Sequence, residues 1–122
     1  MAYLIDLQTK SDDRGSLTVI EKVLPFDIKR VYYIYNNADN LPRAKHRHKK
    51  TIQATICLKG SVEVYNNNGS TKESFLLNDP SKCLILEPQD WHIMRNFSED
   101  AILLVLASSN YDTEDYIHEE YK

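Results

Sequence analysis

The sequence predicts an all-β protein built as a sandwich or barrel, with a short C-terminal helix. Short segments rich in β-branched and aromatic residues recur between positions 3 and 107, and apolar residues alternate with polar ones in many of them. Gly, Pro, Asn and Asp residues separate these segments, as is typical of tight turns between strands. About nine or ten such strands fit into the chain, so we expect a single domain spanning residues 1–122.

Turn residues delimit the strands of the N-terminal third. Gly15 can adopt a positive φ and therefore favours a turn, and Pro25 cannot continue a strand ladder. The segment that follows Pro25 contains a run of valine, isoleucine and tyrosine, which favours another strand. We expect strands over residues 3–7, 16–24 and 30–35, a turn at residues 10–15 and a polar loop at residues 36–42.

Strands continue at short intervals until the last part of the chain, where the pattern changes. The segment 101–107 is the most apolar, so we expect it in the centre of a sheet. Near the C-terminus, Tyr116, Ile117 and Tyr121 have helical spacing and follow acidic residues that a helix N-terminus favours, which predicts a short helix over residues 113–121. Further strands are expected over residues 46–48, 52–58, 61–65, 71–77, 82–87, 91–95 and 101–107, with a hairpin loop at residues 66–69.

Composition and charge argue against several classes of partner. The formal net charge is -3 and the basic residues concentrate in residues 43–50, so we expect a small anion as ligand and no nucleic acid. Cys57 and Cys83 lie in apolar runs and are expected to be buried, and two cysteines are too few for a disulfide framework. Because neither a leader nor a long apolar run is evident, we expect no membrane partner and a cytoplasmic location.

Two histidines, His46 and His48, lie in the middle of the basic run. In a strand, side chains two positions apart point to the same face, so both imidazoles can reach one site. The neighbouring cations should lower both pKa values and keep at least one ring neutral and able to accept a proton. In the alternative interpretation, the two histidines lie on a solvent-exposed strand edge and have no functional role. Gln53 would lie on the opposite face of a continuous strand, so it reaches this site only if the chain turns within residues 49–51.

The spacing of these residues resembles the two motifs of the cupin superfamily. His46, His48, Gln53 and Gly60 follow the first motif, and the segment 88–96 is similar to the second. A glutamine stands where metal-binding cupins have a glutamate, and its neutral carbonyl is a poor substitute for a carboxylate ligand. The resemblance implies a cupin-type jelly-roll barrel with a short C-terminal helix, and a site that holds no metal.

A longer set of matches resembles the WxcM-like family of nucleotide-sugar 3,4-ketoisomerases. Ala44 and Arg47 depart from the family pattern, which has Gly and Ala there, and Arg47 should point away from the two histidines. The resemblance implies a homodimeric enzyme without cofactors. The matching residues are Asp13-Arg14-Gly15, Leu17, Pro25-Phe26, Ile28 to Ile34, Arg43, His46, His48-Lys49, Gln53, Pro88, Trp91-His92, Met94, Asn96-Phe97-Ser98 and Asp115-Tyr116-Ile117.

This family resemblance implies a reaction and a pathway. The substrate would be dTDP-4-keto-6-deoxyglucose, and the product its 3-keto isomer, used for a 3-amino-3,6-dideoxy sugar of surface glycans. Moving the carbonyl requires a base near neutrality for the C3 proton and a donor for the developing oxyanion. We expect His48 to be the main proton-transfer group, with His46 as its partner. The segment Arg14-Gly15 resembles that of members giving the galacto-configured product.

Other residues are candidates for binding the substrate. Arg43 is expected to stabilise the enediolate or the diphosphate, and Tyr35 and Gln53 to hold sugar hydroxyls. Arg14 and Arg30 are either phosphate contacts or surface and interface arginines, and the sequence leaves this open. It also leaves open whether His92 faces the pocket or packs beside Trp91, which we expect in the core, and it predicts a surface position for His118.

Three other functions compete with this interpretation. A nucleotide-sugar 3,5-epimerase acts on the same substrate, but it uses a larger cupin with a His–Asp dyad and a catalytic tyrosine. A metal-dependent cupin dioxygenase would need bound iron or zinc. A non-catalytic sugar-binding cupin would bind the nucleotide sugar without converting it.

Overall fold

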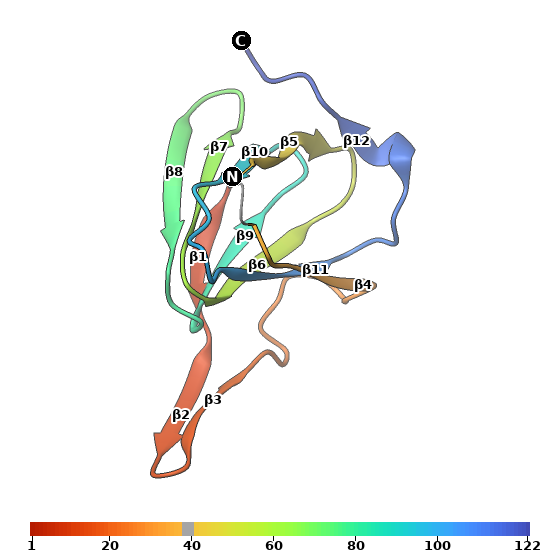
Figure 1. Ribbon diagram of the computed structural model, residues 1–122. Helices are drawn as coiled ribbons and strands as arrows, with labels where there is room; N and C mark the ends of the chain where they lie inside the picture. The colour runs from red at the N-terminus through yellow and green to blue at the C-terminus, as the bar shows by residue number, and fades with distance from the viewer. Residues whose placement is uncertain (38–40) are drawn as a thin grey trace.

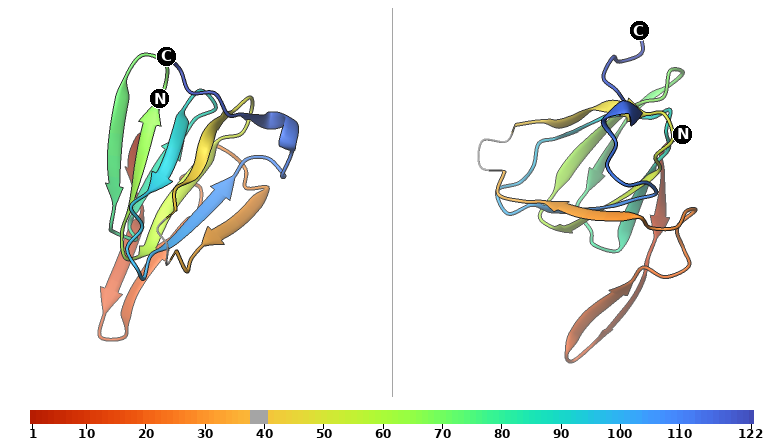
Figure 2. Two further views of the ribbon diagram at one scale, coloured as in Figure 1. Left: turned by 45° about the horizontal axis from the view of Figure 1, so that its top comes forward. Right: turned by 90° about the vertical axis from the view of Figure 1, so that its right-hand side faces the viewer.

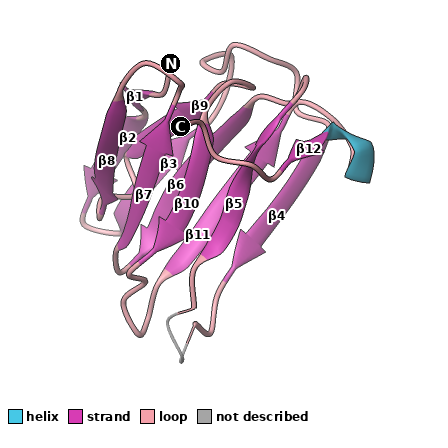
Figure 3. Ribbon diagram, turned by 90° about the horizontal axis from the view of Figure 1, so that it is seen from above, coloured by secondary structure: helices cyan, strands magenta, loops and turns pink. Residues whose placement is uncertain are grey.

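Two five-stranded antiparallel sheets face each other in the computed structural model, which describes residues 1–37 and 41–122 (Figures 1 and 3). One sheet has the order β1-β9-β6-β11-β4 and the other β12-β5-β10-β7-β8. This is the predicted all-β architecture. The strands are β1 (Tyr3–Asp6), β2 (Gln8–Asp12), β3 (Gly15–Val19), β4 (Arg30–Ile34), β5 (Arg43–His48), β6 (Gln53–Lys59), β7 (Val62–Asn67), β8 (Lys72–Leu77), β9 (Lys82–Leu86), β10 (Trp91–Arg95), β11 (Ile102–Ala107) and β12 (Tyr116–Ile117).

The core has two parts, because the sheet that contains β6 is covered on both faces. Successive residues of a strand point to opposite faces, so Leu84 and Leu86 of β9 pack between the sheets while Cys83 and Ile85 pack on the outer side. The segment after β3 covers that outer side with Ile20, Leu24 and Phe26. This explains the continuous apolar runs of these strands. The predicted burial of Cys57 and Cys83 is confirmed, and both thiols are free.

The strand 101–107, predicted to be central, is β11 and lies between β6 and β4, one position from the middle of its sheet. The middle strand is β6. Of the loop predicted over residues 36–42, residues 38–40 lie outside the described part of the chain. Within the described residues, no helix has the length and apolar character needed to cross a bilayer.

The turn predicted over residues 10–15 is confirmed at Asp13 and Arg14, and Gly15 has the predicted positive φ, at 120°, but residues 10–12 belong to the first strand of a β-hairpin. Strands β2 and β3 pair with each other alone and project from the body of the molecule (Figures 1 and 2). Hydroxyl groups hydrogen-bond across the two strands, at 2.9 Å between Thr9 and Thr18 and at 2.7 Å between Ser11 and Ser16. The strand predicted over residues 16–24 accordingly ends at Val19, where the hairpin ends.

The prediction of a C-terminal helix over residues 113–121 is wrong. A 3₁₀ turn forms over Thr113–Asp115 with Asp112 as its N-cap, and the chain then pairs with β5 as β12 (Figure 3). Contacts made by Asp115 and Tyr116 with the histidine strand override the weak helical preference of this segment. The C-terminal segment therefore becomes the edge of a sheet.

The turn required between His48 and Gln53 is confirmed. Strand β5 ends at His48 and β6 begins at Gln53 in the opposite sheet. Ser108 holds the connection, since its Oγ accepts a hydrogen bond from the backbone N–H of Ile52 at 2.8 Å. The change of sheet brings Gln53 back to the same interior as the histidines.

Candidate active site

A cavity of about 200 Å³ lies between β4 at the edge of one sheet and β5, β10 and β12 of the other. Its lining combines cationic, imidazole and phenol groups with apolar side chains, as in sites that bind small polar molecules. The lining residues are Arg30, Tyr32, Ile34, Arg43, Ala44, His46, His92, Met94 and Tyr116.

Three imidazoles gather beside this cavity. The ring centroid of His46 lies 4.9 Å from that of His48 and 5.2 Å from that of His92, and the rings of His48 and His92 are 6.3 Å apart. His46 and His92 are register partners on β5 and β10. His92, whose position the sequence left open, therefore lines the cavity, while Trp91 is buried as predicted.

His118 stands at the border of this group. Its ring centroid is 6.1 Å from that of His46 and 6.2 Å from that of Tyr116. The helix on which we expected it does not form, but the predicted surface position of His118 is confirmed, since the residue is exposed. All four histidines of the sequence thus lie in one region of the fold.

A bulge before His46 aims this side chain at the cavity. Ala44 and Lys45 both have positive φ, 74° and 60°, and the register of β5 with β10 shifts at this point. Such bulges re-aim side chains at functional sites. His46 then turns its Nδ1 toward the carbonyl oxygen of Ala44, at 3.1 Å. Ala44, which replaces the glycine of the family pattern, thus lies at a position whose positive φ favours glycine.

The three histidines are neutral at neutral pH. Burial is the largest cause that lowers the pKa of His46 to about 4, and the neighbouring His48 is the second. Burial also lowers the pKa of His92 to about 3. Burial also lowers the pKa of His48, although the hydrogen bond and charge of Asp115 oppose it. The sequence predicted this direction from nearby cations, but burial is the larger cause. Neutral imidazoles can accept protons, as proton-transfer chemistry requires.

Asp115 is the main residue of this region that the sequence did not reveal. Its Oδ2 lies 2.8 Å from Nδ1 of His48, and both side chains are almost fully buried. Tyr116 follows it, and its ring centroid is 4.6 Å from that of His46 and 4.8 Å from that of His48. No spacing rule links residues so distant in sequence. The only signal was that Asp115-Tyr116-Ile117 belongs to the segments matching the family.

Tyr32 occupies the place that we expected for Tyr35. Side chains alternate along β4, so Tyr32 faces the cavity, whereas Tyr35 just beyond the strand is 56% exposed and stacks on Tyr33 at 5.7 Å. The Tyr32 hydroxyl accepts a hydrogen bond of 3.0 Å from Nε2 of buried Gln53. Burial raises the pKa of Tyr32, so the phenol remains protonated. The alternation of residues 30–35 was the signal that distinguishes the two tyrosines.

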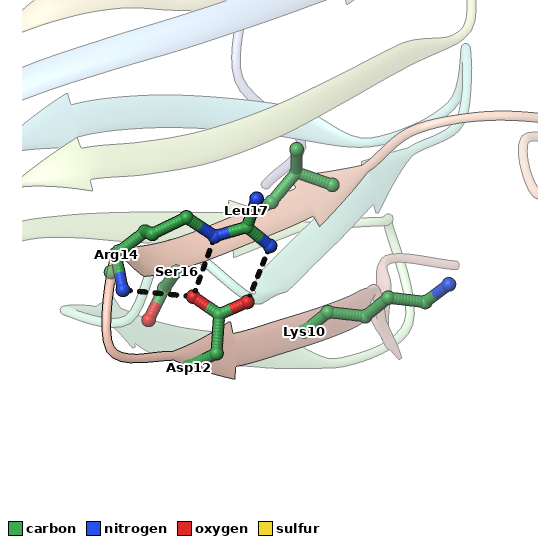
Figure 4. Close-up of a pocket in the computed structure, with 6 residues that line it drawn as sticks. Lys10, Asp12, Arg14, Ser16 and Leu17 are labelled. Atoms are coloured by element: carbon green, nitrogen blue, oxygen red, sulfur yellow. Dashed lines mark hydrogen bonds and ion pairs between the residues drawn. The ribbon is translucent and has the colours of Figure 1, made fainter.

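The arginines divide into two groups. Arg30 and Arg43 line the cavity, and the guanidinium of Arg30 lies 4.4 Å from the centre of the Tyr32 ring. Arg14 does not reach this cavity. It lies on the projecting hairpin, where its guanidinium binds the carboxylate of Asp12 through two hydrogen bonds of 3.2 and 2.6 Å (Figure 4).

Arg47 points away from the histidines, as predicted, and its guanidinium stacks 4.6 Å from the centre of the Tyr121 ring. Among residues 1–37 and 41–122, no three His, Cys, Asp or Glu side chains form a group that could hold a metal ion. A metal-free site stays a prediction.

Comparisons with known proteins agree with this description. The family model described as "WxcM-like, C-terminal" (FdtA) matches residues 2–122. The TDP-4-oxo-6-deoxy-alpha-D-glucose-3,4-oxoisomerase of Aneurinibacillus thermoaerophilus is 42% identical over 118 residues, which are 95% of this chain and 85% of that protein.

Two solved structures of 3,4-ketoisomerases superpose on the fold with a TM-score of 0.92 each. The enzyme from Helicobacter canadensis is 42% identical and covers 97% of this chain and 90% of its own. QdtA from Thermoanaerobacterium thermosaccharolyticum, solved in complex with TDP, is 44% identical and covers 97% of this chain and 88% of its own. The protein therefore belongs to the FdtA family of WxcM-like proteins.

Proposed function

We infer that this protein is a sugar 3,4-ketoisomerase that moves the carbonyl of TDP-linked 4-keto-6-deoxyglucose from C4 to C3. One observation carries the inference. Neutral imidazoles and a protonated phenol surround a small cavity that also contains two arginines, in a chain of the FdtA family. These groups match the needs of the reaction, which are proton acceptors, an oxygen-directed donor and cations for an anionic substrate.

The reaction moves two protons and needs no oxidant. The C3–H bond breaks, its electron pair forms a C3–C4 double bond, and the C4 oxygen becomes an enediolate oxygen that takes a proton. The C3 hydroxyl then loses its proton, a carbonyl forms at C3, and C4 receives a proton on carbon. Two acceptors that also return protons are therefore required, together with a group that stabilises negative oxygen.

We propose that His46 and His48 carry these transfers. His46 lines the cavity and so meets the sugar directly, whereas His48 is 4% exposed and lies against it. These positions favour His46 for the first contact with the sugar, although we expected His48 to be the main proton-transfer group. The Tyr32 hydroxyl is the donor for the developing enediolate, since its raised pKa keeps the proton in place until then.

Arg30 and Arg43 bind the diphosphate in this proposal, and Gln53 acts through Tyr32. Guanidinium groups form paired, charge-assisted hydrogen bonds with phosphate oxygens. A cation beside the cavity also stabilises negative charge on the sugar. Gln53 holds the phenol through its Nε2 and keeps its buried Oε1 without a hydrogen-bond partner in the described structure.

We propose that the enzyme is a cytoplasmic homodimer whose product has the galacto configuration, used for 3-amino-3,6-dideoxy sugars of surface glycans. The projecting hairpin and edge strand β4 support the dimer, because Leu17, Val31 and Tyr33 are exposed apolar side chains on these elements. Arg14 lies on the hairpin, remote from the cavity of its own chain, so it would meet substrate only across such an interface. Sedimentation velocity tests the dimer, and a monomer at micromolar concentration would refute it.

The activity test is incubation with TDP-4-keto-6-deoxyglucose, with the product followed by NMR. The expected result in D₂O is loss of the C3 proton signal and incorporation of solvent deuterium into the 3-keto product, and in H₂O the coupling of the product's C4 proton reports the configuration. Tight binding without conversion would identify a sugar-binding cupin instead. Exchange at C5 with the carbonyl still at C4 would identify a 3,5-epimerase.

A further inference from the structure

The partner of Nδ1 distinguishes His48 from the other two clustered histidines. In His46 and His92, Nδ1 lies 3.1 and 3.0 Å from a backbone carbonyl oxygen. In His48 it lies 2.8 Å from a carboxylate oxygen of Asp115. Carbonyl and ionised carboxylate oxygens can only accept hydrogen bonds, so each Nδ1 carries a proton. When these rings are neutral, each Nε2 is therefore the basic nitrogen.

The contacts of Asp115 keep its carboxylate ionised and fixed in orientation. The backbone N–H groups of Lys49 and Lys50 donate to Oδ1 at 3.1 and 2.8 Å, and Thr51 Oγ1 and His48 Nδ1 donate to Oδ2. Burial raises the pKa of Asp115, but the hydrogen bonds from Thr51, Lys50 and His48 together outweigh it and lower the pKa. All four groups act as donors, which an ionised carboxylate accommodates.

We propose that Asp115 is the positioning residue of the site, which holds His48 with its proton on Nδ1 and makes His48 the ring that stores the transferred proton. This proposal rests on the proposed function, because it names the group that the isomerisation uses for proton storage.

The argument for proton storage is electrostatic. When the buried Nε2 of His48 receives a proton that has left the substrate, the new imidazolium forms a charge-assisted hydrogen bond with a carboxylate that is already in place. In His46 and His92 the same step would leave a cation against a neutral carbonyl, in a buried environment that disfavours charge. The Asp115 carboxylate stays ionised throughout, and the proton on Nε2 returns to the sugar. Nothing else is consumed.

The substitution Asp115→Asn tests this arrangement because it should invert the tautomer of His48. The two backbone N–H groups from Lys49 and Lys50 must face the amide oxygen, since an NH₂ group there would put donor against donor. The NH₂ group of the asparagine then faces Nδ1 of His48, which becomes an acceptor. The proton moves to Nε2, and the ring loses its base on the reacting side.

The primary readout is the ¹⁵N NMR spectrum of histidine-labelled protein, in which protonated and unprotonated ring nitrogens differ in chemical shift. A His48→Gln variant assigns the His48 signals. We expect the Nδ1–H tautomer in the wild type and the Nε2–H tautomer in Asp115→Asn. We also expect kcat to fall on the order of 10²-fold or more, with KM and TDP binding little changed.

Two control variants separate positioning from general structural damage. Glu114→Gln removes the same charge one residue away, from a side chain that is exposed, and should leave the tautomer and kcat unchanged. Thr51→Val removes one donor to Oδ2 but keeps the carboxylate beside His48, so the Nδ1–H tautomer should remain. The melting temperature of each variant reports the structural contribution.

The outcomes are distinguishable. An Nε2–H tautomer of His48 in the wild type overturns the proposal, and this measurement needs no variant if Asp115→Asn does not fold. Loss of kcat in Asp115→Asn with the Nδ1–H tautomer retained also overturns it, as does full activity. The tautomer is measured without substrate, so a wild-type protein that lacks isomerase activity refutes the proposed function on a separate observation.

Discussion

His46 and His92 are register partners on neighbouring strands, and their ring centroids lie 5.2 Å apart. Nδ1 of His46 faces the backbone carbonyl oxygen of Ala44, and Nδ1 of His92 faces that of Asp90. The main chain therefore orients both rings. The two imidazoles therefore depend on strand geometry and not on each other. Substituting one should leave the other in place, which makes single variants interpretable.

The first prediction concerns His46. In His46→Asn we expect kcat to fall by about 10²–10⁴-fold, because the proton-transfer group that lines the cavity is lost. TDP affinity should remain near the wild-type value. Product formation by NMR and TDP binding by calorimetry measure the two effects. His118→Asn, at the border of the cluster, is the matched control and should keep most activity. A fully active His46→Asn would remove the proposed role.

The second prediction concerns the cavity arginines. Arg30→Met and Arg43→Met should each weaken TDP binding by about tenfold or more, since each loses a charge-assisted hydrogen bond to phosphate. Calorimetry at several salt concentrations measures this, and the salt dependence should become shallower. Lys59→Met removes a cation of the exposed surface and should change little. Unchanged TDP affinity in both arginine variants would place the diphosphate elsewhere.

The third prediction concerns the bulge in β5. Ala44 has a φ of 74°, which glycine adopts without steric cost. Ala44→Gly should raise the free energy of unfolding by about 0.5–1 kcal/mol, because relief of the left-handed strain exceeds the entropy that glycine adds to the unfolded chain. Urea unfolding measures the change. The control Ala107→Gly alters a buried strand position without a positive φ and should destabilise the protein.

The fourth prediction is a loss of stability as the pH falls from about 6.5 to about 4. In the native state the pKa of His46 is about 4 and that of His92 about 3, below the ordinary value of 6.5. The unfolded chain therefore binds more protons in this window, and unfolding becomes easier as the pH falls. Each histidine contributes at most about 1.4 kcal/mol per pH unit.

Urea unfolding at a series of pH values checks this prediction. His92→Gln should reduce the slope between pH 4 and 6.5, because one titrating group with a depressed pKa is removed. Carboxylates with lowered pKa values, such as that of Asp115, act at lower pH, so their contribution is separable. A flat profile from pH 6.5 to 4 would contradict neutral, buried histidines.

The fifth prediction concerns metals. Gln53 presents a neutral amide where metal-binding cupins present a carboxylate, and its Nε2 is engaged with the Tyr32 hydroxyl. We therefore expect chelators to leave the activity unchanged. Metal analysis of protein purified without chelator, combined with turnover after dialysis against EDTA, tests this. Near-stoichiometric iron or zinc that is required for turnover would contradict it.

The sequence predicted the main strands and the histidine pair because both depend on a local period of two. Strand bounds such as Trp91–Arg95 follow from the turn residues on either side of the segment. The period of two predicted that the chain must turn between His48 and Gln53. The same rule places Tyr32 and Tyr35 on opposite faces of β4. It did not identify Tyr32 as the cavity residue, because the sequence does not show which face of this strand points inward.

Long-range contacts account for most of what the sequence did not predict. Asp115 and His48 are 67 positions apart, and no local pattern indicates that they form a hydrogen bond. The contacts of Asp115 also explain why the helical spacing of residues 113–121 did not produce a helix. Strand β2 was missed for another reason, because its exposed polar residues lack the apolar alternation by which strands are identified.

The attachment of β12 has a consequence for heat sensitivity. Among the described residues, β12 joins its sheet through Tyr116 and Ile117 alone, and the remaining contacts of the C-terminal segment are hydrogen bonds and ring contacts such as those of Asp115, His118 and Tyr121, so this segment can open locally while the barrel persists. Fraying would withdraw Asp115 from His48 without exposing the apolar interior. Warming should therefore inactivate the enzyme before circular dichroism registers melting, and cooling should restore turnover without refolding.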